Sequence, residues 1–255
     1  MQLSANLGFL WADLSLPDAI LAAKKAGFDA VECHWPYDTP AADVAQALAQ
    51  TGLPMLGLNT RRGNLQAGEN GLSALPGRED EAKAAIDEAV AYGAEIGAQA
   101  VHVMAGFSRG HEAHGTFVQN LRYAAQVAGA ASMTVVIEPL NRHDAPGYFL
   151  QTTDQAAAIL SEVGGDTAKL MFDCYHVGRN EGDIITRLTA LLPMIGHIQF
   201  AGVPARGAPD QGEINYAAVI AQIAALGWQR PLGAEYKPGG DTDATLGWMQ
   251  TLFRQ

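Results

Sequence analysis

The chain has 255 residues, 48% of them hydrophobic, and a formal net charge of −11. This acidic balance argues against nucleic-acid binding, which needs clustered Lys and Arg to neutralise phosphates. Two cysteines are too few for a disulfide framework, no apolar run is long enough for a membrane span, and no signal-like segment opens the chain, so we expect a soluble, cytoplasmic protein.

Short apolar stretches alternate regularly with amphipathic stretches along the chain. The predicted strands cover residues 3–9, 29–33, 54–58, 99–104, 133–138, 169–173, 195–200 and 231–236. The predicted helices cover residues 16–26, 41–50, 79–97, 113–130, about 153–163, 183–192, 216–226 and 242–253. Strands that alternate with helices indicate parallel pairing. Eight such units favour a closed (β/α)8 TIM barrel, with residues 1–255 as a single domain, over a doubly wound open sheet.

Two predicted loops stand out by their length or composition. Residues 59–78 are rich in glycine and show little periodicity, and loops of this length inside compact domains are usually functional or disordered. Arg61 and Arg62 at its start are candidates to hold an anionic substrate, although two solvated arginines explain them equally well. The second functional-looking loop covers residues 141–151.

Four consecutive predicted strands each deliver an oxygen-bearing side chain at or near the C-terminal end, namely Glu138, Asp173, Gln199 and Glu235. In a TIM barrel the catalytic groups sit at this end of the strands. Three carboxylates repel one another unless a cation lies between them, and an all-oxygen set suits Mg2+ or Mn2+ better than zinc. Each acid alone is also explained by a salt bridge or a loop cap, so the prediction depends on the joint pattern.

The two glutamates are candidates for an acid–base pair. A metal that polarises a carbonyl acidifies the neighbouring C–H, and one carboxylate removes that proton. Return of a proton to the adjacent carbon gives an aldose–ketose isomer, whereas return to the opposite face of the same carbon gives an epimer. His176 is a candidate to hydrogen-bond a substrate oxygen, or else a packed junction residue, and Arg206 is a candidate contact for a hydroxyl or carboxylate.

Several motifs together resemble the hydroxypyruvate isomerase family, which belongs to the xylose isomerase-like barrels beside the ketose 3-epimerases. They are Ile137-Glu138-Pro139-Leu140-Asn141, Asp173-Cys174-Tyr175-His176, Gly196-His197-Ile198-Gln199 and Glu235-Tyr236-Lys237-Pro238, and the match extends over almost the whole chain. The resemblance implies a Mg2+ or Mn2+ site built from Glu138, Asp173, Gln199 and Glu235, with the two glutamates as acid and base. It also implies reversible conversion of hydroxypyruvate to tartronate semialdehyde through a cis-enediolate. Lys237 joins the candidate substrate-binding residues.

Two sequence features bear on the substrate. Ketose 3-epimerases typically carry histidine at the position of Gln199, so glutamine shifts the expectation towards hydroxy-oxo-acid isomerases. The family often reads Asn-Leu-Pro-Ala-Gly-Asp-Trp where this chain has residues 59–65, and we hypothesise that Arg61 or Arg62 grips the substrate carboxylate.

Other functions remain as alternatives. A 2-oxo-tetronate isomerase would share every catalytic residue, and a ketose 3-epimerase is less favoured. An endonuclease of the same fold would need more histidine ligands and a basic groove. A non-catalytic sugar-acid binding protein has no reason to keep two opposed glutamates. The expected partner is a small-molecule substrate, and homo-oligomerisation is compatible with the family.

Overall fold

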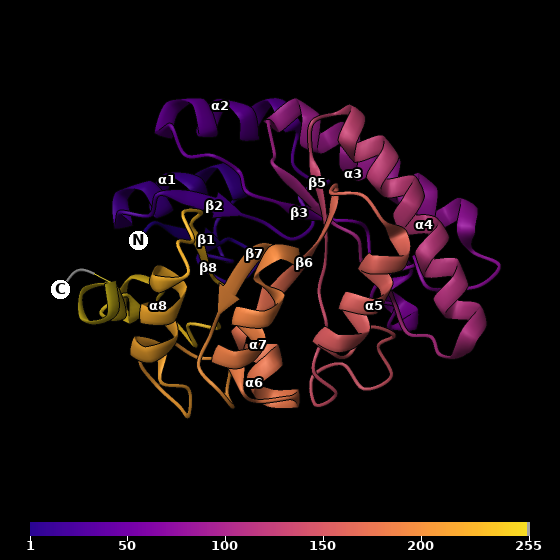
Figure 1. The fold of residues 1–255 in the computed structure, drawn as a ribbon. Helices are drawn as coiled ribbons and strands as arrows, with labels where there is room; N and C mark the ends of the chain where they lie inside the picture. Colours follow the sequence, from indigo (N-terminus) through magenta and orange to yellow (C-terminus); the bar gives the residue numbers. More distant parts are fainter. Residues whose placement is uncertain (254–255) are drawn as a thin grey trace.

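The computed structural model describes residues 1–253 and contains an eight-stranded parallel sheet curled into a barrel, with helices outside it (Figure 1). The strand order is β2-β1-β8-β7-β6-β5-β4-β3. The strands are β1 (Leu3–Asn6), β2 (Ala30–Glu32), β3 (Leu58–Asn59), β4 (Ala100–His102), β5 (Thr134–Ile137), β6 (Ala168–Asp173), β7 (Ile195–Phe200) and β8 (Leu232–Ala234). The predicted (β/α)8 barrel is confirmed.

The barrel is nearly closed at the junction between β2 and β3. An isolated parallel bridge joins Val31 to Met55, and the Leu56 N–H donates to the Val31 carbonyl at 2.7 Å. The strand predicted over residues 54–58 is displaced, because β3 begins only at Leu58 and the preceding segment joins β2 through one isolated bridge and a few backbone hydrogen bonds. Pro54 cannot donate a ladder hydrogen bond and Gly57 has no side chain to pack, so this segment is a poor strand.

The helices follow the strands in alternation and cover the outside of the barrel (Figure 1). They are α1 (Leu16–Ala26), α2 (Ala41–Thr51), α3 (Glu79–Ile96), α4 (Gly110–Ala130), α5 (Thr153–Val163), α6 (Cys174–Asn180), α7 (Ile184–Leu191) and α8 (Tyr216–Ala225). Local chemistry defines several helix ends. The Thr152 side chain accepts the Gln155 N–H at the start of α5, and Gly27 ends α1 in the left-handed conformation.

Two segments differ from the predicted helices. The short helix α6 was not predicted; it begins directly after β6 because the Asp173 carboxylate accepts the Tyr175 N–H at 2.8 Å. The helix predicted over residues 242–253 is instead a 3-10 turn at Asp243–Thr245 and a π-helical segment at Met249–Phe253. Gly247 lies between them, and glycine disfavours a continuous helix.

The inside of the barrel is partly hollow. A cavity of about 290 Å³ lies among the strands, and Gly57 and Gly196 are among the residues that line it. Its walls include the buried pair of Glu32 and His197, whose Oε2 and Nε2 atoms are 2.6 Å apart. Burial lowers the pKa of His197, but the neighbouring Glu32 carboxylate outweighs it and the net pKa is raised.

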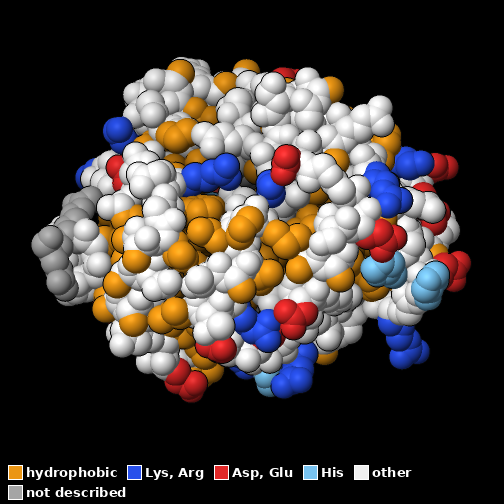
Figure 2. Space-filling model, in the orientation of Figure 1, with side chains coloured by type: hydrophobic (Ala, Val, Ile, Leu, Met, Phe, Trp, Pro, Cys, Tyr) orange, Lys and Arg blue, Asp and Glu red, His pale blue; other side chains and the backbone are white. Residues whose placement is uncertain are grey.

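The exterior of the molecule is mixed in character. On the face drawn in Figure 2, Lys and Arg side chains are scattered among acidic and apolar ones, so this face carries no basic groove. None of the helices within residues 1–253 is long and apolar enough to cross a membrane.

Candidate active site

The four oxygen-bearing residues predicted from the sequence lie at the C-terminal ends of neighbouring strands. Glu138 follows β5, Asp173 ends β6, Gln199 lies near the end of β7, and Glu235 follows β8. Asp173 and Gln199 are register partners, and the Glu235 N–H donates to the Phe200 carbonyl at 3.1 Å. Each of the four residues is at most 5% exposed. The parallel register of β5 to β8 therefore presents all four at one rim.

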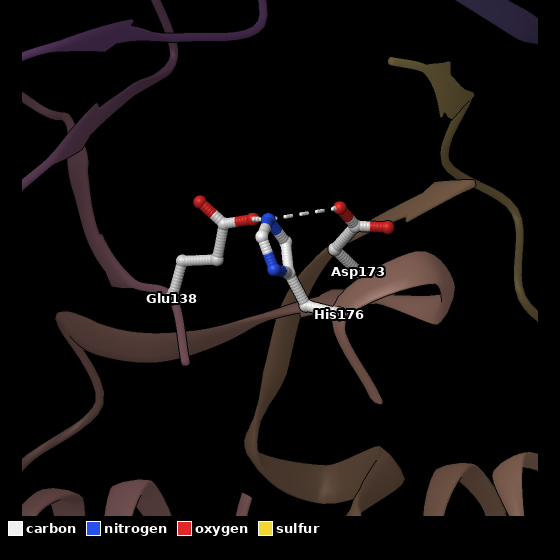
Figure 3. A group of neighbouring side chains, drawn as sticks. All are labelled: Glu138, Asp173 and His176. Atoms are coloured by element: carbon white, nitrogen blue, oxygen red, sulfur yellow. Dashed lines mark ion pairs between the residues drawn. The ribbon is translucent and has the colours of Figure 1, made fainter. Parts of the chain in front are cut away.

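Glu138, Asp173 and His176 form one cluster on this rim. His176 Nε2 lies 3.7 Å from Glu138 Oε1 and 3.7 Å from Asp173 Oδ2. Figure 3 shows the imidazole ring between the two carboxylates. One potential ligand atom from each residue lies within 4.8 Å of the others, a spacing that suits a shared metal ion. His176 reaches this position because α6 begins immediately after Asp173.

The orientation of His176 is fixed by a backbone hydrogen bond. The Asn141 N–H donates to His176 Nδ1 at 2.9 Å, so the neutral ring carries its proton on Nε2. Burial, with the Arg206 charge nearby, lowers the pKa of His176 to about 3. The ring is therefore a neutral donor whose Nε2–H points between Glu138 and Asp173. Asn141 belongs to the Glu138-Pro139-Leu140-Asn141 motif, but its contact with His176 follows only from the fold.

Glu235 is held by three other side chains. Arg206 Nη2 lies 2.5 Å from Glu235 Oε2, while Asn6 Nδ2 donates to Oε1 at 3.0 Å and His34 Nε2 lies 2.9 Å from the same atom. Burial raises the pKa of Glu235, but Arg206 and His34 outweigh it and the net pKa is lowered. Arg206 Nη2 is also 3.5 Å from Asp173 Oδ2, so it balances part of a second carboxylate.

The other carboxylates are harder to ionise without a cation. Burial, followed by the Glu235 and Asp173 charges, raises the pKa of Glu138 well above its usual range. Burial also raises the pKa of Asp173 to about 7, although Arg206 opposes this rise. Among residues 1–253, three buried oxygens of this rim have no hydrogen-bond partner, namely Glu138 Oε1, Asp173 Oδ2 and Gln199 Oε1. Such oxygens fit a hard divalent cation, which would satisfy them and offset the charge.

A cavity of about 170 Å³ opens over this rim. Glu138, Glu235, His176 and Arg206 line it together, and Trp35 forms part of its wall. Most of its lining residues are polar or charged, and together with its small volume this suits a small polar molecule. Gln199 instead lines the deeper cavity inside the barrel, beneath this one.

The three remaining candidate residues occupy different surroundings. Arg61 donates two hydrogen bonds to the Glu88 carboxylate, at 2.6 and 3.0 Å, and is exposed. The Arg62 guanidinium lies 3.9 Å from the centre of the Trp35 ring, beside the cavity wall. Lys237 is exposed and only its backbone N–H approaches the site, at 2.7 Å from the Arg206 carbonyl. The structure thus places Arg62 against Trp35, a residue that lines the cavity, while Arg61, Arg62 and Lys237 are not themselves among the lining residues.

Some residues of the site carried no signal in the sequence. Asn6, His34 and His102 come from the ends of β1, β2 and β4, and each lies near one of the two glutamates. His102 Nδ1 is 3.8 Å from Glu138 Oε2, and burial lowers the pKa of His102 to about 4. These contacts join residues far apart in the sequence, and isolated Asn and His residues have no spacing pattern that reveals them.

Known proteins provide an independent comparison. The xylose isomerase-like TIM barrel family model matches residues 20–252. The chain belongs to this family. A 2-oxo-tetronate isomerase from Cupriavidus necator is 41% identical over 98% of this chain and 97% of its own length. A putative hydroxypyruvate isomerase from Xenopus laevis is 40% identical over 100% of this chain and 96% of its own length. The hydroxypyruvate isomerase of Escherichia coli is 35% identical over 98% of both chains.

Solved structures agree with this placement among the xylose isomerase-like barrels. A crystal structure from Brucella melitensis, named AP endonuclease, family 2, has a TM-score of 0.94 and 32% identity, and covers 98% of both chains. A D-psicose 3-epimerase structure has a TM-score of 0.82 at 16% identity over the full length of both, a likeness that shows the fold alone. The full-length similarity to isomerases at 35–41% identity makes this chain an isomerase, as the sequence predicted.

Proposed function

We propose that the protein interconverts hydroxypyruvate and tartronate semialdehyde (2-hydroxy-3-oxopropanoate) by proton transfer through a cis-enediolate. The observation that carries this proposal is the convergence of Glu138, Asp173, Gln199 and Glu235 on one rim, where three buried oxygens have no hydrogen-bond partner among residues 1–253. Relatives named for isomerases of hydroxy-oxo acids support the substrate class. Both glutamates line one small cavity, as an acid and a base acting on a single substrate require.

We propose Mg2+ or Mn2+ as the cofactor, held by Glu138, Asp173, Gln199 and Glu235. When bound, such an ion would polarise the substrate carbonyl and acidify the adjacent C–H. The donor set offers only oxygen, which favours a hard cation over zinc. His176 presents a ring N–H to the same space, so it suits a substrate oxygen better than a metal while it keeps the Asn141 hydrogen bond.

The protein's own groups account for the proton movements. One glutamate removes a proton from C3 of hydroxypyruvate, and the electron pair of that C–H bond forms the C2–C3 double bond of the enediolate. Delivery of a proton to C2 then gives the aldehyde product, with a second proton shifted from the C3 oxygen to the C2 oxygen. Neutral His176 donates its Nε2–H to the developing oxyanion, and Arg206 keeps Glu235 charged and oriented.

A four-carbon substrate is the second candidate. The Cupriavidus necator relative at 41% identity is named a 2-oxo-tetronate isomerase, and the same acid–base pair would serve that reaction. A ketose 3-epimerase is less favoured, because Gln199 replaces the histidine typical of those enzymes. The proposed partner is therefore a small hydroxy-oxo acid. We also propose a cytoplasmic location, which two buried free thiols, Cys33 and Cys174, suit well.

A substrate panel tests this proposal. Hydroxypyruvate, a 2-oxo-tetronate and D-fructose would be compared by kcat/KM with the same Mn2+-loaded protein. We expect hydroxypyruvate to have the highest kcat/KM and D-fructose to show no turnover. Preference for the 2-oxo-tetronate would select the second candidate, and epimerisation of D-fructose without acid turnover would contradict both.

A further inference from the structure

One wall of the active-site cavity is a row of aromatic rings with an arginine at each end. Arg206 lies 4.8 Å from the centre of the Phe9 ring, and Phe9 packs edge-on against His34 with centroids 5.2 Å apart. His34 and Trp35 follow at 5.0 Å, and the Arg62 guanidinium lies 3.9 Å from the Trp35 ring. Phe9, His34, Trp35 and Arg206 all line the cavity.

The charges of the two arginines are not equally available. Arg206 is engaged by the carboxylates of Glu235 and Asp173, at 2.5 and 3.5 Å. Arg62 has no carboxylate within ion-pair distance among residues 1–253, and its side chain is half-buried on the face of Trp35. Its neighbour Arg61 is neutralised by Glu88. Arg62 therefore provides an unpaired positive charge beside the cavity.

The position of Arg62 is set by ordered neighbours. The Trp35 ring is fixed because its indole N–H donates to the Thr60 carbonyl at 3.1 Å. The Gly71 N–H donates to the Arg62 carbonyl at 2.9 Å, which joins Arg62 to the part of the loop where Asn70 lines the cavity. A planar guanidinium stacked on an aromatic face keeps its edge N–H groups free for a carboxylate.

We infer that Arg62, stacked on Trp35, recognises the carboxylate of the substrate and confines the enzyme to anionic substrates. This inference rests on the proposed function and assigns the residue that binds the carboxylate of the substrate. Glu138, Asp144 and Glu235 line the cavity that an incoming anion must enter. The proposed cation would offset Glu138 and Glu235, and the unengaged guanidinium on Trp35, a residue of the wall, adds a positive charge whose fork geometry matches a carboxylate.

Ligand binding without turnover tests the inference. D-glycerate carries a carboxylate and two hydroxyls but no carbonyl, and glycerol is its uncharged counterpart. Binding of each to Mn2+-loaded protein would be measured by calorimetry and by tryptophan fluorescence. The variants are Arg62→Gln and the matched control Arg61→Gln, which removes the same charge one residue away.

We expect Arg62→Gln to weaken D-glycerate binding by about tenfold or more, the size of a lost charge-assisted hydrogen bond, and to leave glycerol binding unchanged. Arg61→Gln should bind D-glycerate as the wild type does. KM for hydroxypyruvate should rise in Arg62→Gln more than kcat falls. Equal D-glycerate binding by wild type and Arg62→Gln, equal losses in both variants, or no D-glycerate binding by wild type would overturn the inference.

The same experiment separates this inference from the proposed reaction. Selective loss of D-glycerate binding in Arg62→Gln, in a protein that does not convert hydroxypyruvate, would keep Arg62 as the carboxylate-binding residue and reject the proposed substrate. Turnover of hydroxypyruvate with an unchanged KM in Arg62→Gln would keep the proposed substrate and reject Arg62 as the carboxylate-binding residue. Arg62 lies on a loop and is half-buried, so thermal melting of the variant should match the wild type.

Discussion

Nη2 of Arg206 lies 2.5 Å from Oε2 of Glu235, so a buried cation already neutralises one carboxylate of the proposed metal site. The same guanidinium is 3.5 Å from Asp173. Removal of one partner of a buried ion pair is costly because it leaves the other charge unpaired. In the metal-free protein, Arg206 is therefore the main counter-charge of the rim, and a divalent cation would share that role.

The first prediction concerns Arg206→Met. In chelator the variant should lose about 3 kcal/mol of stability, or roughly 6 to 12 °C in Tm. Saturating Mn2+ should recover much of this loss, since a cation would again balance Glu235 and Asp173. Thermal melting with and without Mn2+ measures both effects, with Arg122→Met on the exposed face of α4 as the control. A variant as stable as the wild type in chelator would contradict the assigned role.

The second prediction concerns stability in acid. Burial lowers the pKa of His102 from 6.5 to about 4. Between pH 6.5 and pH 4 the ring is therefore protonated in the unfolded chain but neutral in the native protein. The stabilisation from the neutral ring is thus complete above pH 6.5 and is lost as the pH falls towards 4, by up to about 3 kcal/mol. Denaturant titrations from pH 7 to 4 should show a shallower decline in His102→Gln than in wild type. The exposed His111→Gln should follow the wild-type curve, and parallel curves for all three would refute the effect.

The third prediction concerns Gly233 on β8. A Cβ at this position would lie 2.3 Å from Glu32 Oε1 and 2.9 Å from His197 Nε2, closer than packed atoms allow. Gly233→Ala should cost about 1 to 3 kcal/mol through overpacking. It should also weaken Mn2+ binding, because the same Cβ would lie 2.8 Å from Gln199 Cγ. Gly240→Ala, with no atom within 4 Å of its Cβ, is the control. Melting and calorimetric titration report the two effects, and wild-type values for both would contradict this packing.

The fourth prediction concerns His176. If its Nε2–H stabilises the enediolate oxygen, His176→Gln should lower kcat about a hundredfold, within the range that one preorganised donor contributes. D-glycerate binding should change much less, because that ligand develops no oxyanion. His143→Gln on the exposed part of the neighbouring loop should keep wild-type kcat. An equal loss of glycerate affinity and kcat would indicate a role in ground-state binding instead.

The rim of carboxylates was predictable because a parallel barrel places the C-terminal ends of all its strands on one side. A short apolar strand that ends in an acid therefore identifies both an element and a site residue, as with Glu138 after β5. Asn6 and His34 could not be predicted in this way. Each reaches Glu235 across more than 200 residues of sequence, and only barrel closure brings them together.

Arg61 and Arg62 show a second limit of sequence reasoning. The two residues are adjacent and identical, so the sequence gives both the same candidate role. Glu88 on α3 engages Arg61, whereas Trp35 engages Arg62, and neither contact has a local signal. The short helix α6 was missed for a different reason. Its start is capped locally by the Asp173 carboxylate, which accepts the Tyr175 N–H, but a helix of seven residues is too short to show a clear periodicity in the sequence.

The most direct test of the account follows hydroxypyruvate in deuterated water by NMR, with chelator-stripped protein, with Mn2+ restored, and with Mn2+-loaded Glu235→Gln and Glu138→Gln. Wild-type protein with Mn2+ restored should form tartronate semialdehyde with deuterium at C2. The rate of this conversion should be lower by at least about a hundredfold in the stripped protein and in both variants. Folded, Mn2+-loaded wild type that leaves hydroxypyruvate unchanged, or full activity in both glutamine variants, would contradict proton transfer by this pair.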